Sequence, residues 1–268
     1  MARGVFRFLG LLFCFLLTTS VTQAIIIRHD KADTRYRVDN ADYPQLFYLH
    51  IRSGNKICVA TLIESRWALT AAHCTRQTPL LESVSSHENI YLSIAGKDYR
   101  VESLILHPQS DTGDELHDVD LALIGLDRDI DHVTPASLYR QQDEVNQVFS
   151  LMGWGYSGIG TRGQQSNDGR MRRALNRVVK ADQWLEFFFD DPRQSGGQAL
   201  ELEGVPGLGD SGGPALLETP SGLQVAGIAI GELEEGDAPE RQGLYGSTQL
   251  YERVSSHLEW IESTIRSH

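Results

Sequence analysis

The sequence contains little cysteine, and the cysteines that it has follow no metal-binding pattern. Three cysteines in 268 residues cannot build a small disulfide-dense domain. The chain contains no C-x-x-C or H-E-x-x-H motif, so nothing indicates a metal ion or another cofactor. Basic residues are also in deficit, since 24 Lys+Arg against 36 Asp+Glu give a formal net charge of −12. Such a protein repels phosphate, which argues against nucleic acid or an anionic membrane as a partner.

The remaining composition is that of a well-packed globular protein. Hydrophobic residues make up 41% and charged residues 22% of the chain, with four Trp, nine Tyr and nine Phe. These values argue against disorder, and the length allows one large domain or two small ones with a buried core.

Residues 1–24 are expected to be a secretory signal. Two arginines lie near the start, and an apolar run follows from Phe8 to Leu17. The run is as long as a signal-peptide core and too short for a transmembrane helix, which disfavours an uncleaved membrane anchor. We expect cleavage after Ala24, so that residues 25–268 form the mature domain, secreted or periplasmic and not bound to a membrane.

That cleavage removes Cys14 and leaves Cys58 and Cys74, an even number in an oxidising compartment. A bridge between them would close a loop of about 16 residues and contribute on the order of 3 kcal/mol. The formal charge of the mature chain becomes 22 − 36 = −14.

Short runs of β-branched and aromatic residues recur along the chain, separated by polar turns that contain glycine. This spacing predicts an all-β sandwich or barrel rather than alternating strands and helices. The expected strands are Leu46–Ile51, Cys58–Ile63, Ile90–Ile94, Val101–Leu106, Leu121–Ile124, Val148–Met152, Leu175–Val179, Trp184–Phe189 and Val225–Ile230.

A long helix is expected only at the end of the chain, at about residues 255–266. Apolar residues there recur at helical spacing, and Ser256 with Glu259 fits a capping box. The glycine-rich segment from Ser157 to Gly169 is expected to be a mobile loop.

Ser211 lies in the most informative local motif, G-D-S-G-G-P at 209–214. Glycines on both sides of a serine allow a sharp turn that brings backbone amides close to a substrate carbonyl, as an acyl-transfer nucleophile requires. The same string fits the G-x-S-x-G elbow of α/β-hydrolases, so by itself it does not fix the fold.

A serine nucleophile needs a base to remove its proton. His73 is the best candidate among nine histidines, because it follows an apolar strand and small residues at 67–72. His87, His107 and His132 lie in polar or turn-like contexts and are expected to be ordinary surface or packing residues.

The base needs a carboxylate to fix its tautomer. Asp118 and Asp120 both lie at the start of an apolar segment, where an unpaired charge is costly. Two residues apart on a strand, they share a face, so spacing does not choose between them.

Taken together, these motifs resemble those of the trypsin/chymotrypsin-type serine peptidases. The matching motifs are T-A-A-H-C at Thr70–Cys74, D-(I/V)-x-L-x-L at Asp118–Leu123, G-W-G at Gly153–Gly155, G-D-S-G-G-P at Gly209–Pro214, and a closing strand and helix at Tyr251–Ile261. The aspartate match favours Asp118 over Asp120.

The resemblance implies two six-stranded antiparallel β-barrels followed by a C-terminal α-helix, with the active site between the barrels. Ser211 is then the nucleophile, His73 the general acid–base and Asp118 its orienting group, while the amides of Gly209 and Ser211 form the oxyanion hole. The resemblance implies a protein or peptide substrate, allows a protein inhibitor, requires no cofactor and leaves the oligomeric state undefined.

The resemblance also assigns the cysteines and Asp210. Cys58 and Cys74 match the bridge beside the family's histidine, and Asp210 matches the aspartate that pairs with a freed N-terminal Ile or Val amine. Cleavage after Ala24 exposes Ile25 directly, so we expect no separate zymogen cleavage. Cleavage after Arg37, which exposes Val38, leaves too short a lead-in.

The specificity pocket departs from the family pattern. Val205 stands where trypsin-like members carry an acid, which predicts an apolar pocket, and Gly207 replaces a bridging cysteine. Gly231 and Glu232 replace the expected wall. The acidic residues that follow are expected to be a solvated loop rather than a rim that attracts basic substrates; they are Glu234, Glu235, Asp237 and Glu240.

Two other interpretations remain. An α/β-hydrolase esterase would need His257 or His268 as its base, and the order His, Asp, Ser argues against it. A catalytically inactive family member that acts as a binding module is disfavoured because all three triad residue types are present.

Overall fold

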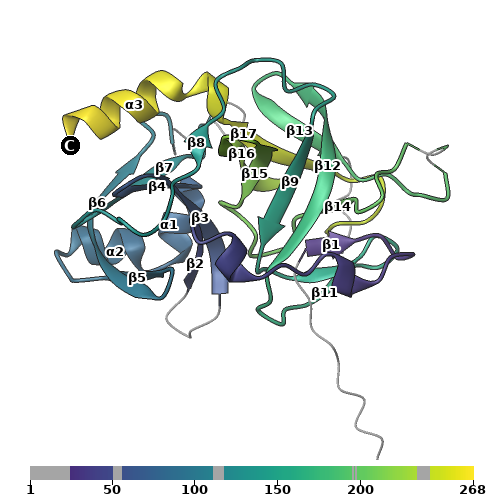
Figure 1. Cartoon of the computed structure of the whole chain (residues 1–268), viewed down its shortest axis with the longest axis horizontal. Helices are drawn as coiled ribbons and strands as arrows, with labels where there is room; N and C mark the ends of the chain where they lie inside the picture. The colour runs from purple at the N-terminus through teal and green to yellow at the C-terminus, as the bar shows by residue number, and fades with distance from the viewer. Residues whose placement is uncertain (1–24, 51–55, 111–117, 195, 197, 234–241) are drawn as a thin grey trace, which may run out of the picture.

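The computed structural model describes residues 25–50, 56–110, 118–194, 196, 198–233 and 242–268. Residues 1–24, predicted to be a secretory signal, lie outside them. Within the described residues the chain is mostly β, with three sheets and a few short helices (Figure 1). The expected all-β fold is confirmed, and each of the nine expected strands coincides with an observed one.

The first half of the chain forms a six-stranded antiparallel sheet in the order β2-β3-β4-β7-β6-β5. Its strands are β2 (Leu46–His50), β3 (Lys56–Glu64), β4 (Trp67–Thr70), β5 (Tyr91–Ile94), β6 (Lys97–Leu106) and β7 (Ala122–Leu126). Two short helices, α1 (Ala72–Gln77) and α2 (Leu80–Ser85), follow β4. Strands β4 and β7 are buried along their whole length, which makes them the centre of this half.

The second half closes into a barrel. Its strands follow the order β15-β9-β12-β13-β17-β16, and pairing of β15 with β16 completes the circle, while β8 (Ser137–Leu138) extends the edge of β16. The strands are β9 (Val148–Gly153), β12 (Arg172–Ala181), β13 (Trp184–Phe188), β15 (Pro214–Thr219), β16 (Gly222–Glu232) and β17 (Thr248–Arg253). Phe187 packs edge-to-face on Phe149 and on Tyr251, which fills the interior with aromatic rings.

A third, smaller sheet was not expected from the sequence. It has the order β11-β10-β1-β14 and consists of β1 (Ile25–Ile27), β10 (Ser157–Ile159), β11 (Gly163–Ser166) and β14 (Gly204–Val205). The prediction of a mobile loop at 157–169 is therefore wrong. Glycine here permits close strand contact, since a Cβ on Gly158 would lie 1.8 Å from the carbonyl oxygen of Gly163.

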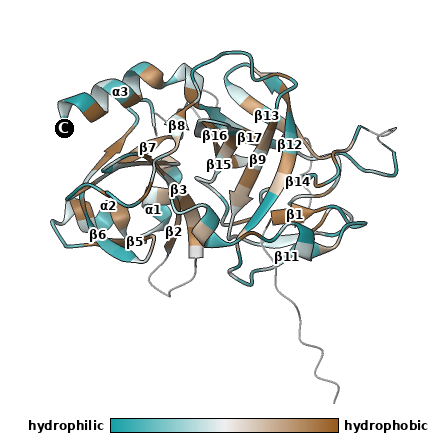
Figure 2. Cartoon of the chain, viewed as in Figure 1, coloured by the Kyte–Doolittle hydropathy of each residue, from teal (hydrophilic) through white to brown (hydrophobic). Residues whose placement is uncertain are grey.

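The C-terminal helix is confirmed as α3 (Leu258–Ser267). The described residues also contain three short 3₁₀ turns, of which the last lies just before α3: η1 (Asp33–Arg35), η2 (Asn40–Asp42) and η3 (Val254–Ser256). Ser256 lies in η3, so the predicted capping box does not form and His257 precedes the helix without a side-chain cap. Hydrophobic and hydrophilic bands alternate along α3 (Figure 2), and Ile261 is buried against the core. Of the helices in the described ranges, none combines the length and apolar character needed to cross a bilayer.

Candidate active site

A cavity of about 300 Å³ brings together His73 and Ser211. His73 lies on α1 in the first half of the chain, and Ser211 lies in the turn before β15 in the second half. The predicted base and nucleophile, 138 residues apart by their numbers (211 − 73), therefore line one cleft.

Asp120 holds His73 at two points. The ring Nδ1 lies 2.5 Å from Oδ2 of Asp120, and the backbone amide of His73 donates to Oδ1 at 2.7 Å. A carboxylate on Nδ1 favours the tautomer in which Nδ1 carries the proton, which leaves Nε2 as the acceptor. This is the arrangement that a general base needs.

The prediction that Asp118 orients His73 is wrong. The backbone around position 120 is fixed on both sides, since the amide of Val119 donates to the carbonyl of Gln109 and the carbonyl of Leu121 accepts from the amide of His107. This segment presents Asp120 to the histidine. Starting from Asp120, the segment is D-L-A-L-I, which keeps the leucine three positions after the aspartate but has leucine in place of the Ile or Val that follows it.

The backbone of the Ser211 turn requires glycine. Gly209 and Gly212 have φ of +91° and +76°, and a Cβ on Gly212 would lie 2.3 Å from the carbonyl oxygen of Val59. The amides of Cys58 and Val59 donate to the carbonyls of Gly209 and Ser211, both at 2.8 Å. Within the described residues, the amides of Gly209 and Ser211 donate no hydrogen bond of their own. Two N–H donors are thus available beside the serine.

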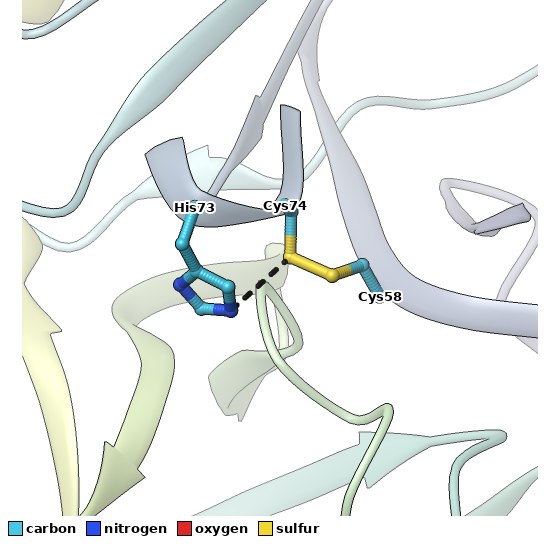
Figure 3. A group of neighbouring side chains, drawn as sticks. All are labelled: Cys58, His73 and Cys74. Carbon is cyan, nitrogen blue, oxygen red and sulfur yellow. Dashed lines mark hydrogen bonds between the residues drawn. A yellow bond between two sulfur atoms is a disulfide. The ribbon is translucent and has the colours of Figure 1, made fainter. Parts of the chain in front are cut away.

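His73 and Ser211 share the cleft without a hydrogen bond between their side chains in the described part of the chain. Nε2 of His73 instead lies 3.7 Å from Sγ of Cys74 (Figure 3). Hydrogen bonds between a nucleophile and its base often tighten only when substrate binds.

Cys58 and Cys74 form a disulfide with a Cα–Cα distance of 5.9 Å. Together with the imidazole of His73 they place three ligand-type atoms within 4.8 Å of one another (Figure 3). The two sulfur atoms are bonded to each other, so they do not offer the thiolates that a metal ion binds. The cluster is therefore a disulfide next to the histidine.

Asp210 is only 1% exposed, and backbone amides surround its carboxylate. It accepts hydrogen bonds from Gly155 at 2.6 Å, from Gly207 at 2.9 Å and from the backbone of Ile25. Burial raises the pKa of Asp210 to about 6, against the opposing effect of these amides. The two residues predicted to pair, Ile25 and Asp210, are therefore in contact, and Ile25 is fully buried.

The prediction that Val205 forms an apolar floor of the specificity pocket does not hold, because its strand β14 pairs with β1. Val205 lies opposite Ile26 and is fully buried in a core cluster with Ile26 and Phe189, outside the described lining of the cleft. The predicted wall residues Gly231 and Glu232 do line the cleft.

The cleft wall also contains Gln249, which sequence reasoning missed. Its Nε2 donates to Oε2 of Glu232 at 2.7 Å, and the amide of Gly243 donates to the same oxygen at 2.8 Å. The only signal for Gln249 is a polar residue within an apolar strand. The predicted acidic loop at residues 234–240 lies outside the described residues.

A model of the Trypsin family matches residues 35–261. The chain belongs to the trypsin family of serine proteases. Its described sheets are mostly antiparallel and its described helices are few, unlike the alternating strands and helices of an α/β-hydrolase fold.

Curated relatives match most of this chain at low identity. An uncharacterized peptidase of Corynebacterium glutamicum (strain R) is 29% identical over 221 residues, which cover 80% of this chain and 65% of the relative. Melanization protease 1 of Drosophila melanogaster is 28% identical, with coverage of 78% and 58%. CLIP domain-containing serine protease B10 of Anopheles gambiae is 28% identical, with coverage of 78% and 61%. The matches therefore span less than two thirds of these relatives.

Proposed function

We propose that the chain is a secreted or periplasmic serine endopeptidase that cleaves proteins or peptides through an acyl-enzyme. This proposal rests on one observation: Asp120 makes two hydrogen bonds to His73, and His73 lines the same cleft as Ser211. The triad is therefore Ser211, His73 and Asp120.

The reaction follows from this arrangement. Ser211 Oγ attacks the scissile carbonyl while His73 Nε2 takes the hydroxyl proton, and Asp120 stabilises the resulting imidazolium. The amides of Gly209 and Ser211 donate to the oxyanion, and each such donor lowers the barrier by roughly 3–4 kcal/mol. His73 then protonates the leaving amine, and water, activated by the same imidazole, releases the acyl group.

We further propose that signal removal is itself the activating cleavage. Cleavage after Ala24 turns the buried amide of Ile25 into an ammonium group beside Asp210, which a buried carboxylate needs as a partner. That ion pair would hold the Gly207–Ser211 turn, because Asp210 also accepts from the amide of Gly207. N-terminal sequencing of active protein tests this, and a start at Val38 or elsewhere would contradict it.

The cleft is proposed to prefer a basic or hydrogen-bond-donating side chain before the scissile bond. Apart from the imidazole of His73, Glu232 is the only ionisable group in its described lining. One oxygen of Glu232 is occupied by Gln249 and Gly243, which fixes the carboxylate in place. An acidic substrate side chain is therefore disfavoured.

Active-site labelling tests the proposed enzyme class. A fluorophosphonate probe should label the protein that begins at Ile25 and should not label Ser211→Ala. Proteolysis of a denatured protein substrate should be lost in His73→Ala, which distinguishes a peptidase from an esterase. A folded wild-type protein that is neither labelled nor proteolytic would instead support an inactive binding module.

A further inference from the structure

Glu252 is a buried carboxylate that contacts the backbone of Asp120 in the candidate triad. It belongs to β17 in the second half of the chain and is 1% exposed. Its Oε1 accepts a hydrogen bond of 2.9 Å from the backbone amide of Asp120. Asp120 in turn belongs to the first half and holds His73. Glu252 thus spans the two halves at the residue that orients the base.

An imidazole lies near the other oxygen of Glu252. Nε2 of His257 lies 3.6 Å from Oε2 of Glu252, and the ring of His257 packs edge-to-face on His107 with a centroid distance of 5.0 Å. His107 packs in the same way on Trp260, at 4.7 Å. Burial, with a smaller contribution from the charge of His257, lowers the pKa of His107 to about 4, so this ring is neutral near pH 7. The ring of His257 therefore lies between Glu252 and the neutral ring of His107.

This hydrogen bond links the two halves of the chain at a point where their alignment matters. Ser211 comes from the second half, whereas His73 and Asp120 come from the first, so the triad depends on how the two halves are aligned. On the serine side, the amides of Cys58 and Val59 already bind the Ser211 turn. On the aspartate side, Glu252 makes the corresponding contact. Reactive groups displaced by about 1 Å can lose roughly 100-fold in rate.

We propose that Glu252 is a positioning residue for catalysis: from the second half of the chain it holds the backbone of Asp120 and so aligns the His73–Asp120 pair with Ser211. The proposal rests on the triad proposed above. A charged acceptor suits this task because hydrogen bonds to a carboxylate are stronger than those to a neutral oxygen.

Two substitutions distinguish a positioning role of the Glu252 carboxylate from the effect of its side-chain volume. Glu252→Met fills a similar volume but has no strong acceptor, and Glu252→Gln keeps an acceptor oxygen while removing the charge. For Glu252→Met we expect kcat per active site to fall on the order of 10- to 100-fold with little change in KM. Glu252→Gln should restore most of that loss.

The pH profile gives a second readout that a purely structural role would not change. The groups facing Glu252 are Asp120, His257 and, behind His257, His107. In Glu252→Gln a negative charge near the His73 imidazolium is lost. The acid limb of kcat/KM should therefore move to lower pH, by on the order of half a unit.

Glu144 provides the matched control. It is fully buried and pairs with Ser255 and with Arg253, which follows Glu252 on β17. Among the described residues it makes no hydrogen bond or ion pair with the triad. Glu144→Met should lower the melting temperature and leave kcat per active site unchanged. Active sites in each preparation are counted by fluorophosphonate titration at a temperature below the melting transition.

The outcomes are distinct. Equal kcat per active site in wild type and Glu252→Met, or equal losses in Glu252→Met and Glu144→Met, would overturn the positioning role. If Glu252→Met does not fold, the pH profile of Glu252→Gln decides, and an unchanged acid limb overturns the proposal. A folded wild-type protein without labelling would instead contradict the proposed function itself.

Discussion

The carboxylate of Asp210 lies in the space that a side chain at Gly153 would need. A Cβ on Gly153 would lie 2.0 Å from Oδ1 of Asp210. A Cβ on Gly155 would likewise lie 2.5 Å from the carbonyl oxygen of Leu208, so both glycines of the Gly153–Gly155 motif have a steric reason. The amide of Gly155 also donates to Oδ1 of Asp210. The site that receives Ile25 depends on this space.

Gly153→Ala should displace Asp210 and disturb the serine turn. We expect a loss of about 2–4 kcal/mol in the free energy of unfolding, together with slower fluorophosphonate labelling. Urea unfolding measures the first effect. Gly231→Ala is the stability control, because a Cβ there meets nothing within 4 Å, and it should unfold as the wild type does. Wild-type stability of Gly153→Ala would contradict the steric argument.

Asp120→Asn should reduce kcat by about 10⁴-fold, because an amide on Nδ1 stabilises the wrong tautomer of the imidazole. Asp118→Asn should keep the wild-type kcat. Steady-state kinetics on a peptide substrate, with active sites titrated, compares the two variants. The reverse result would restore Asp118 as the orienting group.

The pH dependence of stability should change when Ile25 becomes the N-terminus. In a chain with residues before Ile25, the folded pKa of Asp210 is raised from 3.8 to about 6, so ionisation of this group opposes folding. Its contribution to the free energy of unfolding falls as the pH rises from about 4 to about 6, by roughly 3 kcal/mol.

A free Ile25 ammonium group should remove that loss by pairing with Asp210. Urea unfolding between pH 4 and pH 8 should therefore show a chain that begins at Ile25 gaining stability, relative to a chain that begins at Ala24, as the pH rises. Identical pH dependence of the two chains would argue against the pairing. Acetylation of the Ile25 amine is the matched chemical control and should restore the behaviour of the longer chain.

Glu232→Gln should weaken the preference for basic side chains before the scissile bond. Replacing a charge-assisted contact by a neutral one should lower kcat/KM for Arg and Lys substrates by about tenfold and leave uncharged substrates unaffected. Cleavage-site profiling on a peptide library measures this. Glu259→Gln, an exposed position on α3, is the control. A wild-type enzyme that prefers acidic side chains would exclude the proposed role of Glu232.

Features set by local sequence could be predicted, and those set by long-range pairing could not. The nine expected strands are defined by runs of apolar and β-branched residues, which are local. The small sheet is different, because β1 has only three residues and owes its place to partners more than 100 residues away. The burial of Val205 follows from that pairing.

The choice between Asp118 and Asp120 illustrates the same limit. Both carboxylates precede the same buried strand, and the family motif is matched in full from Asp118 and only in part from Asp120. The structure decides through the two hydrogen bonds between Asp120 and His73, which lies 47 residues earlier in the chain. His73 and Ser211, by contrast, lie in motifs whose glycines and small residues define their own turns, so both could be named from sequence.

One covalent bond has two effects on this site. Cys74 directly follows His73, while the amide of its partner Cys58 donates to the carbonyl of Gly209 in the serine turn. The bridge thus fastens the histidine turn and the oxyanion turn to each other. A chain in a reducing environment lacks this covalent link between the two turns. If the chain is the exported protease proposed above, its site would be fully assembled only after the chain reaches an oxidising compartment.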